Sequence, residues 1–221
     1  MGKVDAVIFD LDGTLLDTLE DIADSCNESL SELGMPSRGI DEVRSFVGNG
    51  LGVLMERAVP GGKANPLFRE ALSLMHRNYA RNSRNKTRPY DGVLDLISAL
   101  NERGIKTGIV SNKPDAQVKE LAGIYFKGLI NPEDAAGENE AAGIKRKPAP
   151  DSVLAVMRSL GVSADRCVYV GDSDVDIQTA RNSGLPCISV CWGFRTREFL
   201  EEHGATVLVS KPEDIMDILL V

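Results

Sequence analysis

The stretch VDAVIFDLDGTLL, residues 4–16, decides the interpretation of this chain. Its mostly apolar beginning predicts a buried strand over 4–9, which ends at two aspartates one residue apart, Asp10 and Asp12, followed by a turn at Gly13. Open α/β sheets build their sites at the carboxyl ends of strands. Two like charges this close need a cation or a proton between them, so the pair indicates a functional site. Asp-x-Asp-Gly also occurs in calcium loops and in ordinary turns, which is the alternative.

Strand-like and helix-like segments alternate from residue 89 onward. Strands are predicted at 105–110, 166–170, 187–190 and 206–209. Helices are predicted over 92–104, 114–122, 153–160, 175–182 and 197–202, and from 212 onward. The stretch before the helix at 153 looks irregular and contains Gly and Asn. Alternating β and α units with apolar strands predict an α/β fold, with a doubly wound parallel (Rossmann-like) sheet as its core.

Residues 17–88 break this alternation, because they show helical periodicity without a convincing strand. Asp17 and Glu20 have the spacing of a capping box, which predicts a helix start there. We therefore expect residues 1–16 and 89–221 to form the α/β core and residues 17–88 to form an inserted all-helical cap domain. The alternative is a helical extension that packs elsewhere.

Composition limits the partners of this chain. The 221 residues are 43% hydrophobic and 26% charged, as in ordinary globular proteins, and the net charge of -8 argues against nucleic acid. No apolar stretch approaches the ~20 residues that span a bilayer, and no signal-peptide pattern is visible. We expect a cytoplasmic monomer or homodimer without membrane contact. The four cysteines show no metal-binding spacing, and Cys167 and Cys187 lie in apolar runs that predict core packing.

Three further segments place polar groups at strand ends or helix starts. Ser111 follows a predicted strand, where a hydroxyl can bind phosphoryl oxygens or simply cap a helix. Lys147 precedes Pro148 in a basic run that is otherwise typical of a solvated surface. Asp172 follows another apolar strand, and Asp176 lies in the first turn of the next helix, where an acid can also be a helix cap. Asp174 between them is expected to face solvent or to cap that helix.

These motifs, in this order, resemble those of the haloacid dehalogenase superfamily, most of whose members hydrolyse phosphate esters through a phosphoaspartate. The resemblance implies that Asp10 is the nucleophile and that Asp12 protonates the leaving oxygen and then activates water. It also implies that Ser111 orients the phosphate and that Lys147, directly before the proline, contacts both phosphate and nucleophile.

A magnesium site is expected among the same residues, because Mg²⁺ prefers oxygen ligands. Asp10, the main-chain carbonyl of Asp12 and Asp172 could supply those oxygens. Asp176 could act directly or through water. The expected enzyme is a magnesium-dependent phosphatase.

Within the superfamily, the chain most resembles the phosphoglycolate phosphatases, through residues 10–18, 45–50, 111–114 and 171–173. This resemblance suggests Gly48, Asn49, Asn112 and Lys113 as substrate-binding residues. The substrate is expected to be a small phosphate ester, with 2-phosphoglycolate as the candidate. Residues 131–143 are richer in acid and glycine than that subfamily's pattern, which leaves the substrate open.

Two other functions fit the motifs. A phosphosugar mutase would keep the phosphoaspartate, but residues 17–33 contain no His or Lys to serve as extra acid–base groups. A binding module that is not an enzyme would have no need of a general acid beside a nucleophile.

A basic run over 76–88 contains Arg77, Arg81, Arg84, Lys86 and Arg88 and no acidic residue. It is typical of a solvated helix face. The alternative is that it attracts anionic substrates to the site.

Overall fold

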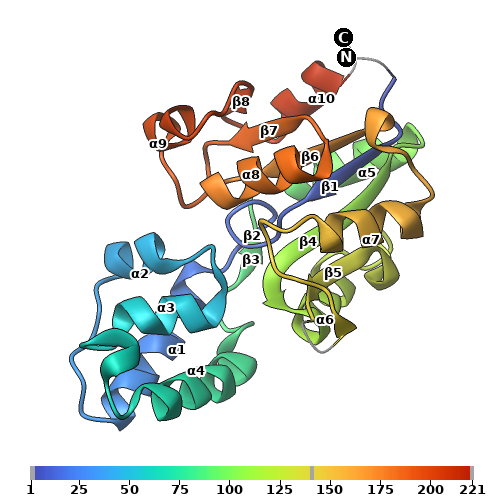
Figure 1. The fold of residues 1–221 in the computed structure, drawn as a ribbon. Helices are drawn as coiled ribbons and strands as arrows, with labels where there is room; N and C mark the ends of the chain where they lie inside the picture. The colour runs from blue at the N-terminus through green and yellow to red at the C-terminus, as the bar shows by residue number, and fades with distance from the viewer. Residues whose placement is uncertain (1–2, 140–141, 220–221) are drawn as a thin grey trace. The chain divides into compact units, whose positions relative to one another are not determined.

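The computed structural model describes residues 3–139 and 142–219. The chain divides into two compact units, Met1–Leu16 with Pro89–Val221, and Asp17–Arg88 (Figure 1). It passes between them within β2 (Leu16–Asp17) and β3 (Arg88–Pro89), which pair with each other. In the described part of the chain, no helix is both long enough and apolar enough to cross a membrane.

The first unit is built on a six-stranded sheet in the order β5-β4-β1-β6-β7-β8. Its strands are β1 (Ala6–Phe9), β4 (Lys106–Pro114), β5 (Ala135–Glu138), β6 (Cys167–Gly171), β7 (Cys187–Val190) and β8 (Leu208–Val209). Every pair of neighbours is parallel. The chain builds outward from β1 first through β4 and then through β6, so β1 lies where the strand order reverses, the usual position for a site in this architecture.

Helices cover both faces of the sheet. Successive residues of a strand point to opposite faces, so the apolar strands give each face an apolar surface for helices to cover. Val7 and Phe9 of β1 pack in one apolar cluster, to which α5, α6 and α10 contribute. Ala6 and Ile8 pack in the other cluster with α7 and α8. The helices of this unit are α5 (Val93–Glu102), α6 (Asp115–Tyr125), α7 (Asp151–Leu160), α8 (Asp174–Ser183), α9 (Arg197–Glu202) and α10 (Glu213–Leu219), with short η2 (Pro132–Asp134) and η4 (Ala164–Arg166). The predicted doubly wound α/β class is confirmed.

Two strands differ from the prediction. β4 continues past Val110 to Pro114, with a shift of its pairing with β5 between those residues, so Ser111 lies within the strand. β5, with the sequence AAGE, was predicted as irregular chain. Its residues lack the β-branched and aromatic side chains that mark a strand, and it forms by pairing with β4.

The second unit is helical, with α1 (Leu19–Glu32), α2 (Ile40–Phe46), α3 (Gly50–Ala58), η1 (Gly62–Ala64) and α4 (Phe68–Asn82). α1 and α4 pack against each other. The predicted capping box at Asp17 is wrong. The residue at the cap position of α1 is Thr18, and Asp17 lies in β2 with its carboxylate 3.2 Å from Arg88 Nη2.

Candidate active site

Asp10 follows the last residue of β1 and is buried between the two neighbouring strands of the sheet. Its backbone N–H donates to the Val170 carbonyl of β6 at 2.8 Å. On the other side, Phe9 is in register with Ile109 of β4. The side chain is therefore fixed at the carboxyl edge of the sheet, with only 5% of the residue exposed.

Lys147 is the cation beside Asp10. Its Nζ lies 2.6 Å from Asp10 Oδ1 and 2.7 Å from Asp176 Oδ1, and it donates to the Tyr169 hydroxyl at 3.1 Å. Asn112 holds the lysine backbone from β4: its Oδ1 accepts the Lys147 N–H at 2.7 Å and its Nδ2 donates to the Lys147 carbonyl at 3.2 Å. The Asn112 side chain thus positions Lys147 in this structure, whereas the sequence suggested that it binds substrate.

Asp12 has a different environment from Asp10. The Ser111 hydroxyl donates to Asp12 Oδ2 at 3.3 Å, and Lys113 Nζ lies 2.9 Å from Asp12 Oδ1. Residues 111 and 113 of β4 both reach the same carboxylate. The structure thus brings Ser111 and Lys113, two of the three predicted residues of this segment, to the predicted general acid.

Asp172 and Asp176 come from the end of β6 and the first turn of α8. Asp172 Oδ2 accepts the Phe194 backbone N–H at 2.6 Å, and Asp176 Oδ2 accepts the Ser173 hydroxyl at 2.5 Å. Ser173 is the N-cap of α8, so Asp174 is not its cap and lies half-buried outside the acidic cluster. A Cβ atom on Gly13 would lie 2.3 Å from Asp172 Oδ2, which explains why glycine follows the aspartate pair.

Carboxylates outnumber ammonium groups around Asp10, and this imbalance determines how the site titrates. Burial, with added repulsion from Asp176, Asp172 and Asp12, raises the pKa of Asp10 well above its ordinary value, although Lys147 opposes it. Burial and the charge of Asp176 raise the pKa of Asp172 to about 7. Burial alone would lower the pKa of Lys147, but Asp10 and Asp176 outweigh it and raise that pKa.

The acidic cluster can hold a metal ion. Asp10, Asp172 and Asp176 each offer an oxygen, and these oxygens lie within 4.8 Å of one another. All three are buried, and hard carboxylate oxygens at the end of two strands suit Mg²⁺. A cation among them would relieve the repulsion that raises the pKa of Asp10 and Asp172. The residues therefore fit the expected metal.

Contacts of three residues in the site, Tyr169, Thr14 and Phe194, were not predicted. The Tyr169 hydroxyl joins Lys147 and Asp176, the Thr14 hydroxyl donates to Asp10 Oδ2 at 3.4 Å, and the Phe194 N–H binds Asp172. Tyr169 had a detectable signal, because a tyrosine inside an apolar strand needs a partner for its hydroxyl. The Phe194 contact uses a backbone group and has no signal in the sequence.

Gly48 and Asn49 lie in the helical unit, between α2 and α3, with Asn49 at the cap position of α3. Their predicted contact with substrate stays a prediction.

The basic run of the helical unit is paired with α1. Arg77 Nη2 lies 2.6 Å from Glu32, Arg81 Nη2 lies 2.5 Å from Glu28, and Lys86 Nζ lies 2.8 Å from Asp24. These ion pairs offset much of the positive charge and favour an ordinary helix surface over attraction of substrate.

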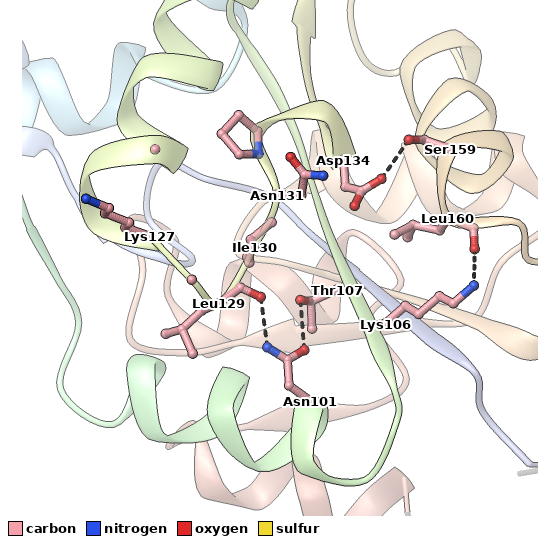
Figure 2. Close-up of a pocket in the computed structure, with 13 residues that line it drawn as sticks. Asn101, Lys106, Thr107, Lys127, Leu129, Ile130, Asn131, Asp134, Ser159 and Leu160 are labelled. Carbon is pink, nitrogen blue, oxygen red and sulfur yellow. Dashed lines mark hydrogen bonds between the residues drawn. The ribbon is translucent and has the colours of Figure 1, made fainter.

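A separate cavity of about 800 Å³ opens near the beginning of β4, away from Ser111 (Figure 2). Several of its polar groups bind one another: Asn101 donates to the Leu129 carbonyl at 2.8 Å and Ser159 donates to Asp134 at 2.6 Å. Its lining, in the part of the chain that the structure describes, contains none of the predicted site residues. This cavity is therefore not the phosphate site.

Comparison with known proteins agrees with the motifs. The model of the haloacid dehalogenase-like hydrolases matches residues 7–190. The chain is 33% identical to a phosphoglycolate phosphatase of Pseudomonas putida, over 96% of this chain and 76% of that protein. It is 36% identical to one of Rhodospirillum rubrum, over 90% of this chain and 84% of that protein.

The fold is matched by a crystal structure from Lactobacillus delbrueckii subsp. bulgaricus, a protein with a provisional phosphoglycolate phosphatase assignment. The TM-score is 0.91 and the identity 36%, with 98% of each chain covered. This chain therefore belongs to the haloacid dehalogenase-like hydrolases and is similar to the phosphoglycolate phosphatases among them.

Proposed function

We propose that this protein is a magnesium-dependent phosphatase that hydrolyses a small phosphate monoester, with 2-phosphoglycolate as the candidate substrate. The observation that carries the proposal is that the buried Asp10 and the partly buried Asp12 have different charged partners. Asp10 lies 2.6 Å from the Lys147 ammonium, and Asp12 is bound by Ser111 and Lys113. One carboxylate lies beside a fixed cation and the other beside a hydroxyl and a second ammonium, which supports different roles for them as nucleophile and neighbouring acid.

In the first step, an Asp10 oxygen attacks phosphorus and the ester P–O bond breaks. Asp12 gives its proton to the departing oxygen, and the alcohol leaves. Lys147 and Ser111 would contact the phosphoryl oxygens and offset their charge. In the second step, Asp12 takes a proton from water, which attacks phosphorus, releases phosphate and restores Asp10.

Asp10, Asp172 and the Asp12 main-chain carbonyl would hold Mg²⁺, which would supply positive charge near the phosphoryl oxygens. The contacts of Asp176 favour an indirect role for it, since Oδ1 accepts from Lys147 and Oδ2 from Ser173. We further propose that the helical unit, residues 17–88, works as a cap domain, with Gly48 and Asn49 as contacts to the substrate.

The test is phosphate release from a panel of small phosphate monoesters, with magnesium or with a chelator. We expect the highest kcat/KM for 2-phosphoglycolate and loss of activity in chelator. Preference for another ester would leave the reaction class intact but refute this substrate. Absence of release from every ester in magnesium would refute the phosphatase proposal.

A further inference from the structure

Lys113 lies next to Asp12, deep in the site. Its Nζ is 2.9 Å from Asp12 Oδ1, and only 4% of its side chain is exposed. The Ser111 hydroxyl donates to the other carboxylate oxygen at 3.3 Å. An ammonium and a hydroxyl therefore hold both oxygens of one carboxylate, which fixes its orientation.

The geometry of β4 accounts for this arrangement. The Ser111 and Lys113 side chains both contact Asp12, and the Lys113 N–H donates to the Ser111 hydroxyl oxygen at 3.2 Å, which orients that hydroxyl. Asn112 between them points to the Lys147 backbone. Three consecutive residues of one strand thus arrange the acid on one side and the lysine on the other.

We propose that Lys113 is a positioning residue, which holds the Asp12 carboxyl group where it can protonate the leaving oxygen. The inference rests on the proposed function. As the Asp10–phosphorus bond forms and the ester P–O bond breaks, the electron pair of that bond stays on the departing oxygen. That oxygen takes the proton from the Asp12 carboxyl group. The carboxylate that results lies beside the Lys113 ammonium, which stabilises it.

This role differs from direct binding of substrate. An ammonium that bound an anionic group of the substrate would chiefly change KM. An ammonium that acts through the general acid changes kcat, and its effect depends on the leaving group. Alkoxides need a proton to leave, whereas p-nitrophenolate leaves readily without one.

The decisive variant is Lys113→Met, assayed with 2-phosphoglycolate and with p-nitrophenyl phosphate. We expect kcat to fall about 100-fold for the alkyl ester and less than about fivefold for the aryl ester, with KM changed less than about threefold. Lys119→Met is the matched control, because Lys119 is a half-exposed lysine of α6 that pairs with Asp115 at 2.9 Å. It removes the same charge and should leave both rates unchanged.

A double variant guards against misfolding. Asp12→Asn/Lys113→Met removes both members of this ion pair and should match Asp12→Asn in activity on the aryl ester, because Lys113 then has no carboxylate to hold. A further loss in the double variant would overturn the proposal. So would a rise in KM with kcat retained, or an equal loss of kcat on both esters, in Lys113→Met. Absence of phosphate release by the unmodified protein would instead refute the phosphatase function, and this role with it.

Discussion

Asp10 is the residue on which the proposed chemistry depends. Asp10→Asn keeps the volume of the side chain and an oxygen that can accept from Lys147, but removes the attacking charge. We expect phosphate release to fall by on the order of 1000-fold or more, with the circular dichroism spectrum unchanged.

Asp174→Asn is the control for Asp10→Asn. It removes a neighbouring carboxylate that lies outside the acidic cluster. Its kcat should stay within about twofold of the unmodified protein. Substantial turnover by Asp10→Asn would exclude a covalent intermediate on this residue.

The cysteine thiols provide a second test at the residue scale. Burial raises the pKa of Cys26, Cys167 and Cys187 to about 12. Because the thiolate is the reactive form, these thiols should react slowly with a disulfide reagent at about pH 8 and rapidly once the protein is unfolded. The absorbance of the thiolate that the reagent releases measures the reaction rate in the folded and in the unfolded protein. Fast reaction of all four cysteines in the folded protein would contradict the burial that the structure describes.

Much of the candidate site could be predicted from local sequence. Asp10 and Asp172 each follow an apolar strand, and the ends of parallel strands meet at one edge of a sheet. The partners of these residues could not be predicted in the same way. Lys147 binds Tyr169, 22 residues away in sequence, and Asp172 binds the Phe194 N–H. Such contacts depend on strand register and on loop paths, which short motifs do not specify.

At the scale of elements, a buried carboxylate joins the beginning of α1 to the chain after α4. Asp21, 1% exposed, accepts the backbone N–H groups of Lys86 and Thr87 and the Thr87 hydroxyl, at 2.8–3.0 Å. Asp21→Asn replaces one acceptor oxygen with a donor. It should lower the free energy of unfolding by about 2 kcal/mol, measured by urea denaturation.

Asp24→Asn is the matched control in the same helix. Asp24 is exposed and pairs with Lys86 Nζ at 2.8 Å, so its loss should change the free energy of unfolding much less than the loss of Asp21. Equal effects of the two variants would show that the buried contacts of Asp21 contribute no more than a surface pair.

The ion pairs between α1 and α4 lead to a further prediction. Because Arg81 lies 2.5 Å from Glu28, its charge is already offset. Arg81→Gln should therefore leave kcat/KM for an anionic ester within about twofold at low salt, and should lower the free energy of unfolding by less than about 1 kcal/mol. A marked fall in kcat/KM that disappears in high salt would instead support the alternative, in which the basic run attracts anionic substrates to the site.

Element types were easier to predict than element ends. Apolar runs such as residues 167–170 and 187–190 identify strands because both of their faces are largely buried. β5 was missed because Ala135–Glu138 has little intrinsic strand preference, and its pairing with β4 decides its structure. The start of α1 was misplaced because the pairing of β2 with β3 holds Asp17 in extended chain.

At the scale of the whole molecule, we expect stability and metal binding to be linked through the acidic cluster. Asp172 has its pKa raised from 3.8 to about 7 in the folded protein. The folded state thus holds a proton that the unfolded state has already lost. The contribution of this group to stability is present below about pH 4 and is lost as the pH rises through about 7. The metal-free protein therefore becomes less stable over this range.

Asp172→Asn should remove this fall in stability at rising pH, and it keeps an oxygen that can accept the Phe194 N–H. Without metal at about pH 8, we expect the variant to be more stable than the unmodified protein, by on the order of 1 kcal/mol, because one buried charge is absent. Magnesium should raise the Tm of the unmodified protein, since a ligand that binds only the folded state stabilises that state. It should have little effect on the Tm of the variant, which lacks one of the proposed metal ligands. Thermal unfolding with magnesium or with chelator measures both effects.

An equal magnesium effect on the two proteins would place the metal away from Asp172. A metal-free variant that is less stable than the unmodified protein would show that the Asp172 charge is already compensated without the ion.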